Sequence, residues 1–153
     1  MMIGAGDARQ QRIGQAIQAM AKEAGFDIKI QPTEFTAQLD KQDAGTFDTS
    51  LIGWSGRADP DGNIHEFVDT KGSLNDSGYS NPQMDKLLDQ SRTTLDQDKR
   101  KQIYSQIQQL VTTDAPLLYI WHDKLFTGAS AKVHGIQFYG DGLLRFKEAG
   151  LTG

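Results

Sequence analysis

The stretch that decides the fold is FDTSLIGWSGRADPDG, residues 47–62. Its first part, Phe47–Ile52, is an apolar run that predicts a buried strand, and the rest is a turn dense in Gly, Pro and Asp. In open α/β sheets, ligands gather where strands end, because the loops there project polar side chains and backbone groups. The stretch is therefore either the ligand-facing edge of a sheet or a strand followed by an ordinary surface loop.

The composition is that of a globular protein without a basic face. Of the 153 residues, 37% are hydrophobic and 24% are charged, and the net charge is −4. The length predicts one domain. Nucleic acid and anionic membranes require a basic face, so neither is an expected partner. No apolar run reaches the ~20 residues of a membrane span, and the residues after Met1 do not form a signal peptide.

The first half of the chain alternates between strand and helix patterns. Met1–Ile3 is apolar and predicts the end of a strand, and Phe26–Ile30 alternates apolar and polar residues before Pro32 stops it. With Phe47–Ile52 these segments give a β-α-β-α-β order, which predicts a parallel sheet with helices packed on it. Right-handed crossovers then place the ends of the second and third strands at the same edge.

Two helices are expected to connect these strands. The first has Gly25 just after its last turn and Gly14 at a position that favours close packing. The second is expected to be capped by Thr33 and to carry Phe35 and Leu39 on one face. The apolar stripe of the first helix consists of Ile13, Ala16, Ile17, Met20 and Ala24.

The second half is mainly helical as far as Pro116. Asn63–Val68 predicts a short helix, Asn81 followed by Pro82 is a strong helix start, and Asp96 opens another helix. The inner face of the helix after Asn81 is expected to consist of Met84, Leu87, Leu88 and Ser91, and the apolar stripe of the helix after Asp96 consists of Ile103, Ile107, Leu110 and Val111.

The remainder is less regular. Leu117–His122 predicts a strand, and Ile136–Tyr139 predicts a second, shorter one. A glycine-spaced tail through Leu143 and Leu144 follows, and it is apolar without an evident partner inside this chain.

The patterns of catalytic and metal sites are missing. There is no cysteine, which excludes disulfides, thiol catalysis and thiolate metal sites, and the three histidines show no ligand spacing. A calcium loop beginning at Asp59 fails, because Ile64 stands where the loop needs glycine and Thr70 where it needs glutamate. Ser55 lies outside any nucleophile elbow. We therefore expect no catalytic residues, no metal and no cofactor.

The side chains around Trp54 are instead suited to non-covalent recognition of a ligand. Trp54 offers a flat apolar wall with one N–H donor, and Arg57 offers a planar fork that suits a carboxylate or a phosphate. Two alternatives stay open: Arg57 forms a salt bridge with Asp59 or Asp61, or Trp54 is a core residue that caps the sheet. The residues expected to bind a ligand are Gly53, Trp54, Ser55, Arg57 and Asp59.

A set of short motifs gives the chain a family resemblance. In chain order they are Phe47-Asp48, Gly53-Trp54, Asp59-Pro60-Asp61, Tyr79–Leu88 (YSNPQMDKLL), Lys99-Arg100 with Tyr104, and Asp114–Tyr119 (DAPLLY). Each motif alone is weak, but together and in this order they are specific. The chain resembles the C-terminal lobe of the family 5 (peptide and nickel type) extracytoplasmic solute-binding proteins of ABC importers.

The resemblance implies a fold, a location and partners. It implies an α/β lobe of the type II periplasmic-binding-protein fold, with a mixed sheet flanked by helices. Residues 1–153 would form a single lobe of a longer two-lobed protein, and the tail 134–153 would return to the missing N-terminal lobe. The partners would be a small solute and the membrane subunits of the importer, and the location would be periplasmic or at the cell surface.

One position departs from the family pattern. Peptide-binding members carry an aspartate shortly after the Gly-Trp pair, which holds the amino terminus of the peptide. Arg57 is the nearest equivalent here, and an arginine does not pair with an ammonium group. The resemblance therefore implies uptake of a solute that is not anchored by a free amine, and an acidic or carboxylate-bearing solute is more consistent with Arg57.

Three functional hypotheses follow. The first is a non-enzymatic solute-binding component of an ABC importer, which captures a peptide-like or other small, acidic solute by hinge closure between two lobes. The second is an α/β enzyme fragment that uses Asp59, Asp61 and His65 as acid–base groups. The third is an interaction fragment that binds no solute well by itself.

Overall fold

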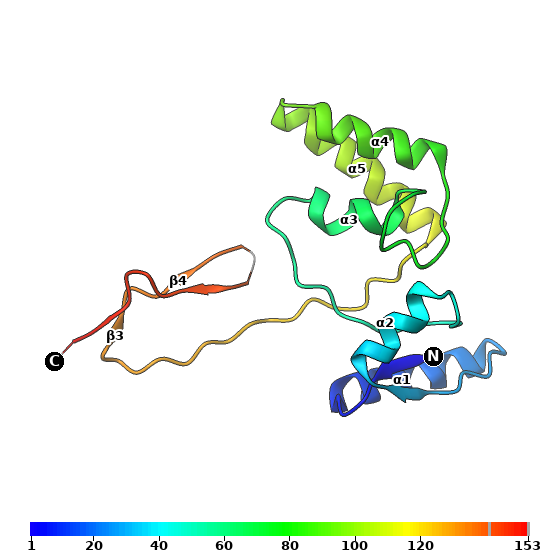
Figure 1. The fold of residues 1–153 in the computed structure, drawn as a ribbon, viewed down its shortest axis with the longest axis horizontal. Coiled ribbons are helices and arrows are strands. Elements are labelled where there is room, and N and C mark those ends of the chain that lie inside the picture. The colour runs from blue at the N-terminus through cyan, green and yellow to red at the C-terminus, as the bar shows by residue number, and fades with distance from the viewer. Residues whose placement is uncertain (141, 153) are drawn as a thin grey trace. The chain divides into compact units, whose positions relative to one another are not determined.

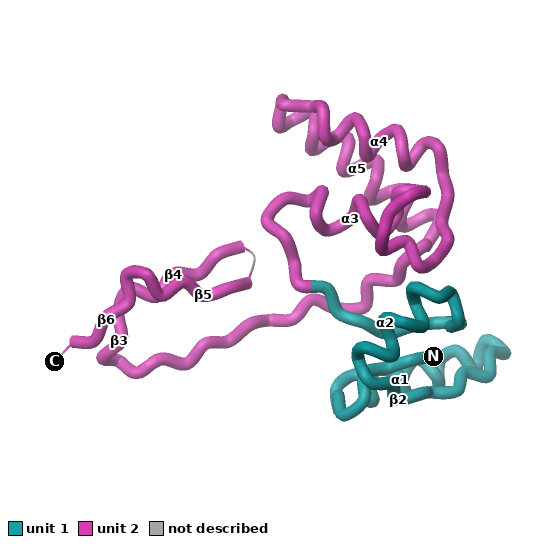
Figure 2. Tube along the Cα trace, in the orientation of Figure 1, with its two compact units in different colours: residues 1–54 teal, residues 55–153 magenta. Residues whose placement is uncertain are grey.

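The structure, a computed structural model, describes residues 1–140 and 142–152 (Figure 1). These residues form two compact units, which meet in sequence between Trp54 and Ser55 (Figure 2). Unit 1 contains β1 (Met2–Gly4), α1 (Ala8–Glu23), β2 (Gln31–Thr33) and α2 (Phe35–Asp43). Unit 2 contains α3 (Asp61–Val68), α4 (Pro82–Thr93), α5 (Gln97–Asp114), β3 (Val133–His134), β4 (Gln137–Phe138), β5 (Leu144–Arg145) and β6 (Gly150–Leu151).

Strand β1 is the centre of unit 1. It pairs in parallel with β2 on one side, and on the other side Met2 forms a parallel bridge with Ser50. The Met2 amide donates to the Thr49 carbonyl (2.8 Å), and the Leu51 amide donates to the Met2 carbonyl (2.9 Å). Met2 and Ile3 are only 3% and 1% exposed. The predicted parallel arrangement of the first half is therefore confirmed.

The predicted bounds of two strands are wrong. The strand expected at Phe26–Ile30 is assigned at Gln31–Thr33, so Pro32 lies inside it. Within the described residues β2 pairs only with β1, and such an edge strand tolerates the missing N–H of proline. The strand expected at Phe47–Ile52 is reduced to the bridge at Ser50.

Helix α1 forms as predicted, although fewer residues of its predicted apolar stripe are covered than expected. Gly25 follows it with a φ of 89°, the left-handed conformation expected after a helix end. Gly14 is the buried residue of α1, and a Cβ there would lie 3.2 Å from Cε of Met1. This close approach confirms the packing role expected of Gly14. Met20, predicted to lie in the apolar stripe, is 64% exposed.

Helix α2 buries amides instead of the expected apolar pair. Phe35 and Leu39 are 62% and 37% exposed, whereas Gln38 is 1% exposed. The Nε2 atom of Gln38 donates to Oγ of Ser50 (2.7 Å) and to the Leu51 carbonyl (3.0 Å). Gln38 lies on the inner face of α2 because the segment after this helix contains a backbone carbonyl, that of Leu51, which needs a hydrogen-bond donor. The predicted Thr33 cap is also wrong, since the N-cap is Glu34, without a side-chain hydrogen bond.

The helices of unit 2 form at the predicted positions. The Asn81 side chain accepts hydrogen bonds from the amides of Gln83 and Met84, and the Asp96 side chain accepts one from the Lys99 amide. Helices α3, α4 and α5 enclose one apolar core (Figure 1). The buried members of this core are Val68, Met84, Leu87, Leu88, Ile107 and Val111.

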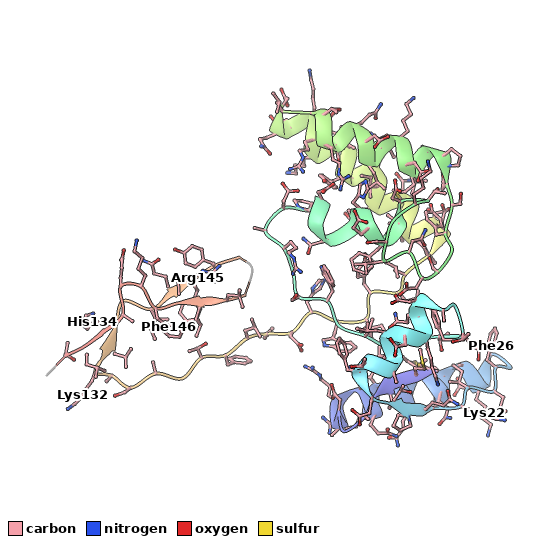
Figure 3. The ribbon with its side chains drawn as sticks, viewed as in Figure 1. Lys22, Phe26, Lys132, His134, Arg145 and Phe146 are labelled. Carbon is pink, nitrogen blue, oxygen red and sulfur yellow. The ribbon has the colours of Figure 1, made fainter. Side chains whose placement is uncertain are left out.

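The last part of unit 2 contains two short antiparallel pairs. The strand predicted at Leu117–His122 is absent from the assigned elements, because a strand needs a neighbouring ladder to pair with. The strand predicted at Ile136–Tyr139 is confirmed as β4, which pairs with β5, while β3 pairs with β6. Arg145 and Phe146 lie at and just after β5 (Figure 3).

Gly135, between β3 and β4, has a φ of 74° and a backbone neighbour at Glu148 that leaves no room for a Cβ. A non-glycine residue would therefore be strained twice at this position, by its backbone conformation and by the clash. The expectation that residues 134–153 return to another lobe stays a prediction.

The helical core of unit 2 predicts a contrast between two leucines. Leu88 is fully buried, so Leu88→Ala is expected to lower the free energy of unfolding by about 2–5 kcal/mol. Leu95 is 92% exposed, so Leu95→Ala is expected to change it by less than about 0.5 kcal/mol. Urea unfolding followed by far-UV circular dichroism measures both values. Equal losses in the two variants would contradict the assignment of this core.

Candidate functional site

The predicted ligand-binding residues lie in one exposed segment. Gly53 and Trp54 are the last residues of unit 1, and Trp54 is 47% exposed. An exposure of this size does not fit the alternative of a core residue that caps the sheet. Ser55, Arg57 and Asp59 belong to unit 2 and lie in Ser55–Asp61, which we call the arginine loop.

The side-chain amide of Asn63 holds the backbone of the arginine loop. Its Oδ1 accepts a hydrogen bond from the Arg57 amide (2.7 Å), and its Nδ2 donates to the carbonyls of Arg57 (2.7 Å) and Asp59 (3.0 Å). Asn63 is in the first turn of α3, so the loop is folded back over the start of this helix.

Both acidic side chains of the arginine loop form bidentate pairs with arginines of other helices. Asp59 accepts from Nη1 (2.8 Å) and Nη2 (2.7 Å) of Arg100 on α5. Asp61 accepts from Nε (2.7 Å) and Nη2 (2.9 Å) of Arg92 on α4. The two carboxylates of the loop are therefore paired with arginines of α4 and α5, and Arg57 is the cation of the loop itself.

The side chain of Arg57 lies along its own loop. Its Nη1 donates to the carbonyl and to Oγ of Ser55, the latter at 2.9 Å. A Cβ on Gly62 would lie 2.9 Å from Cγ and 3.0 Å from Cβ of Arg57, so the glycine makes room for the stem of the arginine. The guanidinium is thus directed by its neighbours on an exposed loop.

The ion pairs shift the protonation of the loop carboxyls. Hydrogen bonds from Arg100 and from the Asp61 amide lower the pKa of Asp59 to about 2. The Arg92 guanidinium likewise lowers the pKa of Asp61. Both groups are therefore ionised near neutral pH, where a general acid would need its proton.

The enzyme alternative finds no support in this geometry. His65 is 8% exposed, and its Nδ1 lies 3.3 Å from Oε1 of Glu66. Asp59 and Asp61 are engaged by arginines, as described above.

Across residues 1–140 and 142–152, no three His, Asp or Glu side chains come together as metal ligands, and no helix is long and apolar enough to cross a membrane.

Two of the motifs from the sequence lie together in unit 2. The Tyr79 hydroxyl donates to Oδ2 of Asp114 (2.6 Å), and Nδ2 of Asn81 donates to the same oxygen (2.9 Å). Partial burial together with this carboxylate raises the pKa of Tyr79 to about 12. The start of α4 is thereby joined to the end of α5.

Sequence reasoning missed the residues that hold the arginine loop: Asn63, Arg92 and Arg100. Arg100 belongs to one of the motifs of the family resemblance, which was the only available signal. Its contact with Asp59 spans 41 positions, and no local pattern identifies such a partner.

Comparisons with known proteins identify the class of protein. The family described as "Bacterial extracellular solute-binding proteins, family 5 Middle" matches residues 1–75. The "Oligopeptide-binding protein OppA" of Bacillus subtilis is 29% identical over 147 residues, which are 94% of this chain and 27% of OppA. The chain thus spans about a quarter of the length of the curated relatives it matches.

Solved structures agree with the sequence comparison. The murein tripeptide binding protein MppA of Escherichia coli has a TM-score of 0.69 at 26% identity, over 75% of this chain and 23% of MppA. A dipeptide binding protein of a Pseudoalteromonas species, solved in complex with Met-Leu, has a TM-score of 0.77 at 24% identity, over 94% of this chain and 29% of that protein. The latter likeness concerns the fold alone.

The fold is therefore α/β and is that of the type II periplasmic binding proteins. The family 5 resemblance that the motifs indicated is confirmed, because residues 1–75 match the family model and the curated relatives of the chain are family 5 peptide-binding proteins. Its relatives in this family are solute-binding proteins and not enzymes.

The lowered pKa of Asp59 predicts how the ion pair responds to acid. A carboxyl with a lowered pKa adds stability above its ordinary pKa of 3.8 and loses this contribution as the pH falls toward the folded value of about 2. Asp59 is 57% exposed, so we expect Asp59→Asn to cost at most about 1 kcal/mol at neutral pH.

The stability difference between the wild type and Asp59→Asn should shrink between about pH 5 and about pH 2. Unfolding free energies measured across this range test the expectation, with Asp98→Asn on the exposed face of α5 as the control. A difference that does not vary with pH would contradict the assigned pair.

Proposed function

We propose that the complete protein containing this chain is the solute-binding component of an ABC importer and binds a small peptide-like solute through a carboxylate. OppA is an oligopeptide-binding protein and MppA is a murein tripeptide binding protein, which supports a peptide-like solute. The observation that supports the carboxylate is the pairing within the arginine loop. Asp59 and Asp61 are engaged by Arg100 and Arg92, and Arg57 is the cation of the loop itself.

The proposed contacts divide between an apolar wall and a cation. The indole of Trp54 would cover an apolar part of the solute, while the guanidinium of Arg57 would meet the carboxylate through paired hydrogen bonds. Gly53 and Ser55 would contribute backbone groups, and Asp59 would shape the loop. No covalent step is involved, and the solute would be held by non-covalent contacts alone.

The remaining features of the proposal concern the complete protein. Residues 1–153 would form the C-terminal lobe, the solute would be trapped by closure of two lobes, and the tail 134–153 would run to the other lobe. The protein would act outside the cytoplasm and deliver the solute to the membrane subunits of the importer. The isolated lobe is expected to bind the solute weakly, because half a cleft buries less of a ligand.

Removal of the Arg57 charge tests the carboxylate contact. In the complete protein, isothermal titration calorimetry compares tripeptides without acidic side chains in two forms, with a free carboxyl terminus and with an amidated one. Arg57→Ala is expected to weaken binding of the free acid by about tenfold or more, since a hydrogen bond to a charged group contributes about 1.5–3 kcal/mol. Binding of the amidated form is expected to change little.

The matched control is Arg12→Ala, which removes an exposed arginine from α1. It is expected to leave both affinities unchanged. If Arg57→Ala still prefers the free acid by the wild-type factor, Arg57 does not hold the carboxylate.

Tryptophan fluorescence tests the second contact. The chain has two tryptophans, Trp54 and Trp121, so single Trp→Phe variants of the complete protein measure what each contributes to the signal. We expect saturation with a bound tripeptide to shift the emission of the wild type and of Trp121→Phe, because a solute over the Trp54 ring removes water from it. Trp54→Phe should show a smaller shift than Trp121→Phe. An equal shift in the two variants would exclude this indole from the contact.

A further inference from the structure

We infer that Arg100 and Arg92 are positioning residues, which hold the arginine loop in the conformation that presents Arg57 to the solute. This inference rests on the proposed function, and it adds two helices to the machinery of binding. Neither arginine is placed against the solute. Each acts through an aspartate of the loop.

Arg100 links three parts of unit 2 with one planar group. Its Nη1 and Nη2 hold Asp59, its Nε donates to the Ser91 carbonyl (3.0 Å), and its Nη2 also donates to the Tyr104 hydroxyl (3.2 Å). The guanidinium carbon lies 5.1 Å from the centre of the Tyr104 ring. The side chain of Arg100 is only 18% exposed, so the guanidinium is fixed on several sides.

The partners of Arg100 are themselves anchored in the core. Ser91 is 1% exposed, and its Oγ lies within hydrogen-bond distance of the Leu88 carbonyl (2.8 Å) and the Tyr104 hydroxyl (3.2 Å). Leu88 is fully buried between the helices. The position of Arg100 is therefore set by the packing of α4 against α5.

Arg92 holds the loop at a second position, Asp61, which is two residues after Asp59. Its pair with Asp61 comes from α4, whereas the pair of Asp59 comes from α5. In addition, Oδ1 of Asp59 accepts a hydrogen bond from the Asp61 amide (2.9 Å). One bidentate pair would leave the loop able to rotate about it, but two pairs from different helices fix the direction of the Asp59–Asp61 turn.

The turn is coupled to Arg57 by contacts described above. The Asn63 amide bonds to both Arg57 and Asp59, and Gly62 lies against the stem of Arg57. A change in the direction of the turn therefore moves the backbone from which the Arg57 guanidinium projects.

A role in stability alone does not explain this arrangement. Asp59 and Arg92 are 57% and 44% exposed, and exposed ion pairs contribute about 0–1 kcal/mol to the folded state. Bidentate geometry adds direction, which a point charge such as lysine does not reproduce. The effect of losing the fork should therefore appear in the loop and in the affinity, and much less in the stability.

The test replaces Arg100 by lysine in the complete protein, which keeps the charge and removes the fork. Hydrogen–deuterium exchange reports the amides of Arg57 and Asp61, calorimetry reports the affinity for the free-acid and amidated tripeptides, and thermal unfolding reports stability. Lys101→Gln, one position along α5 and exposed, is the control.

We expect Arg100→Lys to exchange both amides about tenfold faster and to bind the free acid about three- to tenfold more weakly, since lysine gives up the bidentate geometry. The affinity for the amidated peptide should stay at its wild-type value, and the melting temperature should fall by only a few degrees, about the effect of an exposed ion pair. Asp59→Asn should reproduce these changes, and Lys101→Gln should show none of them.

Gly62→Ala separates the guanidinium from its supports. The added methyl group would meet the stem of Arg57 while Asp59 and Arg100 remain paired. We expect slow exchange of the Asp61 amide together with weaker binding of the free acid.

The outcomes distinguish two failures. Unchanged exchange at Arg57 and Asp61 in Arg100→Lys and in Asp59→Asn overturns the positioning role, and so does faster exchange with unchanged affinity for the free acid. Equal affinity of the wild type for the two forms of the peptide overturns the proposed carboxylate contact, whatever the exchange shows.

Discussion

The pair between Asp59 and Arg100 is the interaction on which the candidate site depends. It brings the end of an exposed loop to a side chain that is held by Ser91 and Tyr104, and through them by the packing of α4 on α5. A loop of seven residues has little structure of its own, and its backbone is ordered by groups from three helices. The conformation of the arginine loop is thus an outcome of the helical core behind it.

The sequence predicted the elements whose signals are local. Asn81 and Asp96 cap α4 and α5 within three residues of themselves, and Gly25 ends α1 by its own backbone conformation. The family resemblance was likewise carried by short motifs, and it proved correct. The order of the elements and the class of the fold could therefore be predicted.

The predictions that were wrong or incomplete all concern contacts between residues that are far apart in the sequence. Phe26–Ile30 does alternate apolar and polar residues. The paired segment is nevertheless Gln31–Thr33, because these are the residues that lie opposite the three residues of β1. Gln38 is buried because Ser50 and Leu51 need a donor, and Phe35 is consequently outside. For the candidate site, Trp54 and Arg57 could be proposed from their chemistry and stay predictions, whereas Arg92 and Arg100 could not be proposed, since hydrogen bonds across 31 and 41 positions leave no periodic pattern.

Because the two ion pairs are exposed, the salt concentration around the protein affects them. Charges at the surface are screened over about 10 Å at an ionic strength of ~0.1 M, and over shorter distances in more concentrated salt. Arg57 and the exposed carboxylate of Asp59 respond to this screening, whereas the partly buried Arg100 responds less. For the proposed function, added salt would weaken the long-range attraction of a charged solute to the loop more than the contact pair of Asp59 and Arg100, because screening acts mainly on charges farther apart than the screening length. In saline surroundings the proposed capture would be slower, while the pair that holds the loop would persist.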